Sequence, residues 1–250
     1  MFIESIKEAV IVQAIRTVIS WFYTLLLLVP TCVLSTLTFH KFAFPIWGNV
    51  ARLWGKGSLK IVGINCILEN EPSYSGQSRR IILINHQSIL DMVWFASIAP
   101  NGFSGIAKKS MLYMPIVNWV MWSSRQIFID RRNRVKAIKT LDGVIKKLRK
   151  DNRTICFSPE GTRTRDGEMG PFKKGAFHIA IQSGLTIHPI VVAGAYELMP
   201  PGSLFTKSGT IRLRFLEPIE TSDWKTETIE EHMEEVHSKM LLAYNEMRAS

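Results

Sequence analysis

The sequence predicts an α/β fold, a layered sheet flanked by helices, with a hydrophobic membrane segment at the N-terminus. Beyond about residue 58, β-branched runs alternate with stretches of helical spacing, as they do in layered α/β domains. The chain of 250 residues is 46% hydrophobic and 21% charged, which suffices to bury one large core. We therefore expect a membrane-associating helical segment over residues 1–57 and a folded α/β domain over residues 58–250.

The N-terminal segment contains an uncharged run, residues 17–39, that is long enough to cross a hydrocarbon core of roughly 30 Å. A cleaved signal peptide fits less well, because Glu4 and Glu8 precede the run and no A-x-A-like site precedes His40. Two arrangements are open: one spanning helix or, because Pro30 interrupts the run, two short helices within one leaflet. Lysine and arginine are more frequent just after the run than before it, which favours a cytoplasmic location for the rest of the chain.

The elements of the α/β domain follow from the periodicity of apolar residues. Runs rich in Ile and Val predict strands, and apolar residues spaced three and four apart predict helices. The expected strands cover residues 61–68, 80–84, 127–129, 154–157, 186–192 and 210–215. The expected helices cover residues 89–99, 134–150, 174–182 and 228–247, of which the last is amphipathic.

Charge and cysteine content limit the function classes. Lys and Arg outnumber Asp and Glu by 31 to 21, and the net charge of +10 favours an anionic partner: a phosphorylated substrate, an acidic lipid or nucleic acid. We expect most of the basic excess of residues 125–153 on the wet face of a helix, which would also suit an anionic bilayer. Cys32, Cys66 and Cys156 are far apart, so we expect no disulfide framework, no zinc site and a reducing compartment.

A first candidate site lies where a strand is expected to pass into a helix, a common ligand-binding position in α/β sheets. Asn85, His86 and Asp91 occupy this junction. His86 and Asp91 would meet if His86 sits in the turn and Asp91 in the first helical turn. Ser88 would allow this as the N-cap, with the helix starting after His86 and Asp91 at the third helical position. Alternatively, Ser88 and Asp91 form only a capping box, and His86 is an ordinary loop residue.

A second candidate site, residues 157–177, follows another expected strand and combines glycines with basic side chains. Gly161 lets the backbone approach a ligand, Thr162 can donate a hydroxyl, and Arg163 offers a planar fork suited to phosphate. The stretch matches neither the P-loop nor the dinucleotide fingerprint. It predicts an anion cradle, with a solvated basic loop as the alternative.

Four sequence blocks resemble, in order and spacing, those of the glycerolipid acyltransferase family, and within it the bacterial 1-acylglycerol-3-phosphate acyltransferases. The blocks are Asn85-His86-x-x-x-x-Asp91, Ile127-Phe-Ile-Asp-Arg131, Pro159-Glu-Gly-Thr-Arg163 and Ile187-His-Pro-Ile-Val. The hydrophobic N-terminal segment is also similar. Two positions depart from the family pattern: Arg125 stands near the usual place of a glycine before the second block, and Ser158 replaces a bulky apolar residue.

The resemblance implies a glycerol-3-phosphate acyltransferase-like fold, with the catalytic domain over residues 58–250. It implies transfer of a fatty acyl group from acyl-CoA or acyl-ACP to the sn-2 hydroxyl of lysophosphatidic acid, which gives phosphatidic acid. Because the thioester is already activated, the reaction needs a base rather than a protein nucleophile, and His86 fits that role with Asp91 holding its tautomer. The substrate-binding residues that the resemblance implies are Lys108, Arg131 and Arg163 around the phosphate, Glu160, Gly161 and Thr162 at the glycerol, and Asn85.

The implied partners are lysophosphatidic acid, an acyl thioester, an anionic membrane and, as one form of donor, acyl carrier protein. No metal or further cofactor is implied. The expected location is the inner (cytoplasmic) membrane, with the catalytic domain facing the cytoplasm. Two alternatives stay open: a related acyltransferase acting on glycerol 3-phosphate or another lysolipid, and a noncatalytic membrane lipid-binding protein. A nucleic-acid binder is disfavoured, because residues 17–39 tether the chain to a bilayer and no nucleic-acid motif is recognised.

Overall fold

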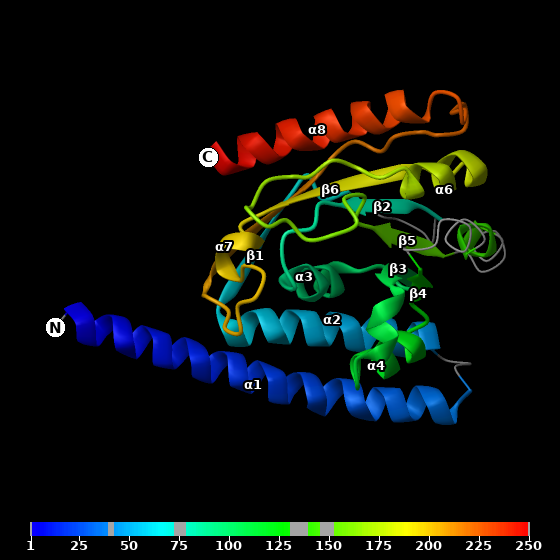
Figure 1. The fold of residues 1–250 in the computed structure, drawn as a ribbon. Coiled ribbons are helices and arrows are strands. Elements are labelled where there is room, and N and C mark those ends of the chain that lie inside the picture. Colours follow the sequence, from blue (N-terminus) through cyan, green and yellow to red (C-terminus); the bar gives the residue numbers. More distant parts are fainter. Residues whose placement is uncertain (1, 40–42, 73–78, 131–139, 146–152, 250) are drawn as a thin grey trace.

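A computed structural model describes residues 2–39, 43–72, 79–130, 140–145 and 153–249 of the chain. These residues form a seven-stranded sheet in the order β1-β7-β6-β2-β5-β3-β4 (Figure 1). Neighbouring strands are parallel throughout, except that β6 and β7 are antiparallel. The strands are β1 (Ile64–Glu69), β2 (Ile81–Ile84), β3 (Phe103–Lys108), β4 (Ile127–Ile129), β5 (Thr154–Phe157), β6 (Ile187–Ala193) and β7 (Gly209–Phe215).

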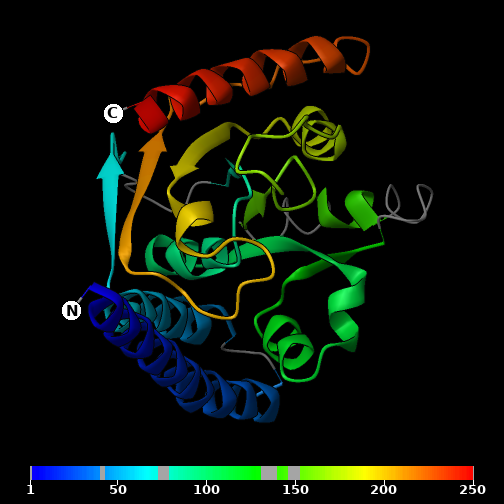
Figure 2. The ribbon, with the colours of Figure 1, turned by 60° about the vertical axis from the view of Figure 1, so that its left-hand side comes forward.

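Helices cover both faces of this sheet, so the predicted layered α/β fold is confirmed. On one face lie α6, α8 and the helical residues 140–145; on the other lies α3, followed by α2 and then α1 (Figures 1 and 2). The helices are α1 (Phe2–Leu37), α2 (Ala43–Val62), α3 (Leu90–Ile98), α4 (Val117–Ser123), α6 (Gly175–Ser183), α7 (Ala195–Leu198) and α8 (Ile229–Ala249), with a 3-10 helix, η1 (Lys109–Tyr113), before α4.

The centre of the sheet is buried on both faces, which explains the continuous apolar runs of β2 and β5. Successive side chains of a strand point to opposite faces. Accordingly, Ile81 and Leu83 join the core beneath α6 and α8, whereas Ile82 and Ile84 join the core beneath α2 and α3. The segments that carry His86 and Glu160 thus leave the sheet from two fully buried strands.

Most predicted elements are present, and the differences have local causes. The strand expected at residues 61–68 begins at Ile64, because residues 61 and 62 complete the last turn of α2. Strand β3 and helix α2 were not among the predicted elements. Of the helix expected at residues 134–150, residues 140–145 are helical and the rest lies outside the described residues. The division between residues 57 and 58 stays a prediction; α2 crosses it.

The hydrophobic N-terminal segment is one continuous helix. Pro30 lies inside α1, so the alternative of two short helices is wrong. At 1.5 Å per residue, the 36 residues of α1 extend about 54 Å. Residues 8–37 form the one described helix that is long and apolar enough to cross a membrane by length and composition.

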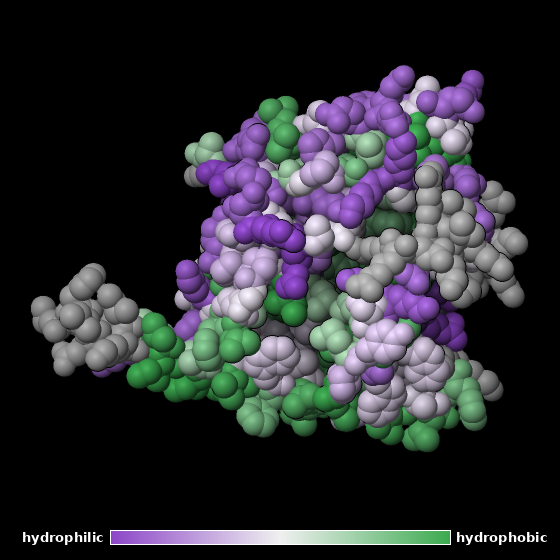
Figure 3. Space-filling view, viewed as in Figure 1, coloured by the Kyte–Doolittle hydropathy of each residue, from purple (hydrophilic) through white to green (hydrophobic). Residues whose placement is uncertain are grey.

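Much of the outward face of helix α1 is apolar, and several of its hydroxyl groups face inward. Phe22, Leu26 and Leu37 are 69%, 71% and 71% exposed, whereas Thr17 and Ser35 are buried. A band of hydrophobic side chains follows the lower edge of the molecule over α1 (Figure 3). An exposed apolar face of this extent marks a surface that meets protein or lipid.

Glycines in α2 allow its neighbours to approach closely. A Cβ added to Gly55 would lie 2.5 Å from the backbone nitrogen of Ser97 and 2.6 Å from the carbonyl oxygen of Val93, both in α3. Neither backbone atom can move without shifting α3. A Cβ added to Gly57, by contrast, would meet the side chain of Tyr23 in α1.

We expect Gly55→Ala to lower the free energy of unfolding by about 3 kcal/mol, because α2 and α3 must separate to admit the methyl group. Gly143→Ala is the matched control: it is also a helical glycine, but nothing lies within 4 Å of its added Cβ. The control should be neutral or gain up to about 1 kcal/mol from helix propensity. Denaturant unfolding in detergent measures both variants, and equal stability of Gly55→Ala and wild type would contradict this packing.

Candidate active site

The sheet places the two predicted sites at one edge. Strands β2 and β5 are parallel neighbours, with Leu83 opposite Phe157. His86 lies three residues after Leu83, and Glu160 lies three residues after Phe157. Both therefore emerge side by side from the carboxyl edge of the sheet. Strand β3 pairs parallel with β5 and ends at Lys108, on the same edge. This is the edge where α/β sheets commonly bind ligands.

His86 and Asp91 meet as predicted. The Nδ1 atom of His86 lies 2.6 Å from Oδ2 of Asp91, and the carboxylate is buried. In the neutral tautomer whose Nδ1–H donates a hydrogen bond to this carboxylate, the lone pair of the imidazole lies on Nε2. The His86 side chain is 28% exposed, and no protein group among the described residues bonds Nε2. The pair therefore presents an open basic nitrogen at the sheet edge.

Asp91 also holds the turn that carries His86. Its Oδ2 atom accepts the backbone N–H groups of Gln87 at 2.7 Å and Ser88 at 2.9 Å, and its Oδ1 accepts the indole N–H of Trp94 at 3.0 Å. One of the two bonds of a capping box is present, that from the Ser88 N–H to the Asp91 carboxylate, whereas Ser88 Oγ accepts the N–H of Leu90 at 3.3 Å instead of that of Asp91. The capping-box and dyad interpretations are therefore compatible.

The start of α3 differs from the prediction. Ile89 is the N-cap and Leu90 the first helical residue, so Ser88 lies one residue before the N-cap and Asp91 is the second residue of the helix. The physical reason is that Ser88 Oγ donates to the carbonyl oxygen of Met199 at 2.6 Å, which fixes the serine to a distant loop.

Asn85 is buried and spans a gap to β6. Its amide Nδ2 donates to the carbonyl oxygen of Val192 at 2.9 Å, and its Oδ1 accepts the Val192 N–H at 2.7 Å. Both polar groups of Asn85 are thus used within the protein. Its role in substrate binding stays a prediction, and the observed contacts are those of a residue that braces the sheet.

The second predicted site is a loop wrapped around the His86 turn. Glu160 is 4% exposed; its Oε1 accepts the backbone N–H of His86 at 2.7 Å and its Oε2 accepts that of Gly170 at 3.0 Å. Gly161 has φ of +71°, a left-handed conformation that glycine adopts without strain. Thr162 and Arg163 follow it and are exposed, available to a ligand.

Cations gather near this loop. Lys108 lies exposed at the end of β3. Lys173, which the sequence reading did not single out, has its Nζ 2.9 Å from the Cβ position of Gly161. The basic pair Lys173-Lys174, near the end of the glycine-rich stretch, is the sequence feature that could have indicated it. Arg131 lies outside the described residues.

Comparison with known proteins settles the family. A family model described as Acyltransferase matches residues 65–193. Over 221 residues the chain is 30% identical to a 1-acyl-sn-glycerol-3-phosphate acyltransferase from Limnanthes douglasii, which covers 88% of this chain and 75% of that protein. The chain belongs to the acyltransferase family. The resemblance of the four sequence blocks is thereby confirmed.

Bacterial proteins support the same placement of this acyltransferase. A 1-acyl-sn-glycerol-3-phosphate acyltransferase from Haemophilus influenzae is 28% identical over 88% of this chain and 91% of its own length. The crystal structure of PlsC, the 1-acyl-sn-glycerophosphate acyltransferase of Thermotoga maritima, aligns with a TM-score of 0.78 at 24% identity. That alignment covers 95% of this chain and 97% of the other, so the two chains share one fold.

The structure explains one departure of this acyltransferase from the family pattern and describes the other. Arg125 has φ of +57° just after α4, the left-handed position where helices commonly end on glycine. A glycine would adopt this conformation without the strain that Arg125 bears. Ser158, in place of a bulky apolar residue, has a buried Oγ with no hydrogen-bond partner.

Two further residues of the acyltransferase contact the His86 turn. Gln87 is buried, and its Nε2 donates to the hydroxyl of Tyr244 at 2.6 Å. From the sequence, Tyr244 was only one residue of the amphipathic helix expected over residues 228–247. Its hydroxyl carried no sequence signal, because the contact joins residues 157 positions apart.

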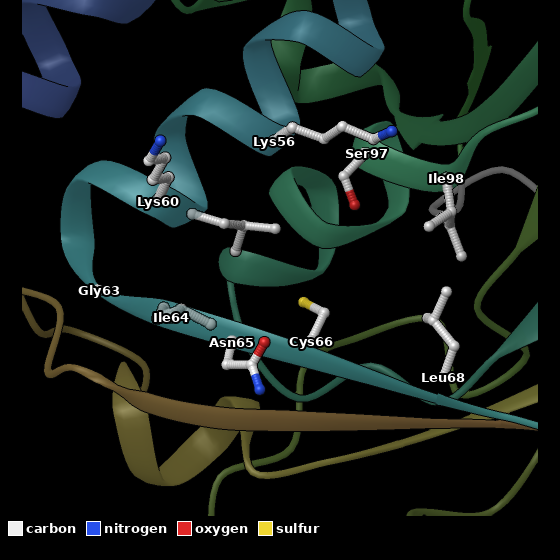
Figure 4. A pocket seen from close by; sticks show the side chains of 10 residues that line it. Lys56, Lys60, Gly63, Ile64, Asn65, Cys66, Leu68, Ser97 and Ile98 are labelled. Atoms are coloured by element: carbon white, nitrogen blue, oxygen red, sulfur yellow. The ribbon is translucent and has the colours of Figure 1, made fainter.

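A cavity of about 540 Å³ lies elsewhere, between α2, β1 and the end of α3 (Figure 4). Cys66 and Leu68 of β1 face Ser97 and Ile98 of α3 across it, and none of the predicted site residues lines it. Burial raises the pKa of the Cys66 thiol to about 11, so this thiol is protonated at neutral pH. The two lysines at the cavity, Lys56 and Lys60, are exposed.

Burial raises the pKa of Glu160 to about 7, against the lowering effect of the N–H groups of His86 and Gly170. The folded protein therefore keeps this proton where the unfolded chain, with a pKa near 4.5, has lost it. Its contribution to stability is full below about pH 4.5 and is lost as the pH rises through 7.

We expect the free energy of unfolding of wild type, relative to Glu160→Gln, to fall by roughly 3 kcal/mol between pH 4.5 and pH 7.5. The amide does not titrate, so the difference between the two proteins isolates this one group. Denaturant titrations at several pH values measure it. The carboxyl of Glu227 is exposed, so Glu227→Gln is the control and should show no such trend. A flat difference for Glu160→Gln would contradict the raised pKa.

Proposed function

We propose that this acyltransferase moves a fatty acyl group from a thioester of coenzyme A or acyl carrier protein to the sn-2 hydroxyl of lysophosphatidic acid, giving phosphatidic acid. The observation that carries the proposal is the 2.6 Å contact between His86 and Asp91 beside an exposed Arg163 loop. The names of the relatives from Limnanthes douglasii and Haemophilus influenzae support the same acceptor.

His86 acts as the general base in this proposal. Its Nε2 takes the proton of the acceptor hydroxyl as the oxygen attacks the thioester carbonyl carbon. Asp91 stabilises the imidazolium that forms, as the acid of a catalytic triad does. The tetrahedral intermediate then expels the thiolate, which takes the proton from His86. The carbon–oxygen bond replaces the carbon–sulfur bond, and the base returns neutral without a metal or further cofactor.

The acceptor phosphate is proposed to bind among the cations of the carboxyl edge. Arg163 offers a bidentate fork, and Lys108 and Lys173 add point charges nearby. Arg131 is assigned to the same site by the family resemblance alone. Glu160 supports this loop through backbone contacts, so its effect on the acceptor is indirect.

The outward apolar face of α1 supports an association with the membrane, where an insoluble acceptor resides. Its inward polar groups are satisfied by protein: Gln13 Nε2 donates to the carbonyl oxygen of Val62 at 3.0 Å, and Thr24 Oγ1 accepts from Trp54 at 2.9 Å. Exposed Tyr113 and Trp122 extend the aromatic surface through η1 and α4. We place the enzyme at the inner membrane, with its catalytic domain in the cytoplasm.

We expect His86→Ala to lower transfer at least 10²-fold, because the base is lost, while folding and membrane association stay unchanged. Asp91→Asn should also lose about 10²-fold or more, since an amide cannot accept the Nδ1 proton in the same way. Purified protein is assayed with labelled acyl-CoA or acyl-ACP against lysophosphatidic acid, glycerol 3-phosphate and other lysolipids. Substantial transfer by His86→Ala, or wild-type preference for another acceptor, would overturn the assignment.

Arg163→Ala should raise the KM for lysophosphatidic acid about 10- to 100-fold, the loss expected for a hydrogen-bonded charge pair, and leave the KM for the acyl donor unchanged. Arg165→Ala is the matched control, because it removes an equal charge from the same exposed loop. Initial-rate kinetics, with the concentration of each substrate varied in turn, measure the two KM values separately. An effect confined to the acyl donor would be inconsistent with a phosphate role for Arg163.

A further inference from the structure

Tyr244 connects the last helix to both parts of the active site. Its side chain in α8 is fully buried. The hydroxyl accepts a hydrogen bond from Gln87 Nε2 at 2.6 Å and donates one to the carbonyl oxygen of Gly167. Gln87 directly follows His86, and Gly167 lies in the loop that carries Arg163. One phenol oxygen thus bonds the base turn and the phosphate loop at once.

The same two segments are joined by a second connection, which closes a ring. The backbone N–H of Thr164 donates to the carbonyl oxygen of His86 at 2.9 Å. Thr164 Oγ1 in turn accepts the backbone N–H of Gly167 at 3.0 Å. From His86 the ring passes through Thr164, Gly167, Tyr244 and Gln87 and returns to His86. Each link is a hydrogen bond or a peptide bond, so neither segment can shift without breaking one.

Burial strengthens the constraint that this ring imposes. Gln87 and Tyr244 are both withdrawn from water, so solvent does not replace a lost bond. Burial also raises the pKa of Tyr244 to about 12, which keeps the phenol protonated and able to donate. Arg248, one helical turn further along α8, pairs with Glu168 of the loop outside the ring.

We infer that Tyr244 is a positioning residue: its hydroxyl fixes the Arg163 loop at the distance from His86 that places an anchored acceptor hydroxyl on Nε2. The inference rests on the proposed function, because it concerns the distance between the proposed base and the proposed phosphate site. Tyr244 does not touch the reacting atoms. It acts through Gln87 on one side and Gly167 on the other.

The test is Tyr244→Phe, which keeps the ring packing and removes only the hydroxyl. We expect kcat/KM with lysophosphatidic acid to fall about tenfold, with the KM for acyl-CoA unchanged. Tyr196→Phe is the matched control. It also removes a tyrosine hydroxyl that donates to a carbonyl oxygen of this loop, that of Arg165 at 3.0 Å. Within the described part of the chain, no hydrogen bond joins the Tyr196 side chain to the His86 turn. The control should retain wild-type kinetics.

A double-mutant cycle with Arg163→Ala separates positioning from a loss of folded enzyme. If Tyr244 sets the register of an anchored phosphate, Tyr244→Phe should cost less than twofold once Arg163 is absent. A merely structural role would reduce the active fraction by the same factor in both backgrounds. Equal losses in the two backgrounds, or a Tyr244→Phe variant as active as wild type, would overturn the inference. Failure of the wild type itself to acylate lysophosphatidic acid would instead refute the proposed function.

Discussion

A single buried carboxylate organises the reactive turn of this acyltransferase. Asp91 accepts the ring proton of His86, the backbone N–H groups of Gln87 and Ser88, and the indole N–H of Trp94. Four donors on one side chain fix its position, and through it the tautomer and direction of the imidazole. Because the carboxylate is buried, each of these bonds is costly to lose. The backbone conformation of the turn and the orientation of the His86 ring therefore depend on the same group.

The parallel sheet extends this constraint to the loop that carries Arg163. Register between β2 and β5 brings Glu160 to the backbone of His86, and Glu160 in turn holds Gly170 at the far side of the loop. Its carboxyl is buried at a cost that shows in its raised pKa. The C-terminal helix adds a second support from outside the sheet through Tyr244. The loop that carries the exposed Arg163 is thus held in place by these contacts.

Helix α1 reverses the usual distribution of polarity, and this suits a lipid substrate. In a soluble protein the apolar face of a helix packs on the core. Here the outward face is apolar and the inward face carries hydroxyl and amide groups bonded to α2 and α4. The active-site layer and the apolar surface belong to one molecule, connected by the close contact of Gly55 with α3. Packing therefore fixes the position of His86 at the sheet edge relative to the exposed apolar face of α1.

Local sequence determined most of the elements and the His86–Asp91 contact, and tertiary structure decided the rest. The apolar runs of β2 and β5 predicted buried strands, and the spacing of His86 and Asp91 predicted their contact, because such patterns depend on neighbours within one turn or strand. The N-cap assigned to Ser88 was wrong because Met199, far away in sequence, holds its hydroxyl. The contact of Glu160 with His86 spans 74 residues and that of Gln87 with Tyr244 spans 157. Such pairs depend on which strands and helices become neighbours, and no local periodicity encodes that choice.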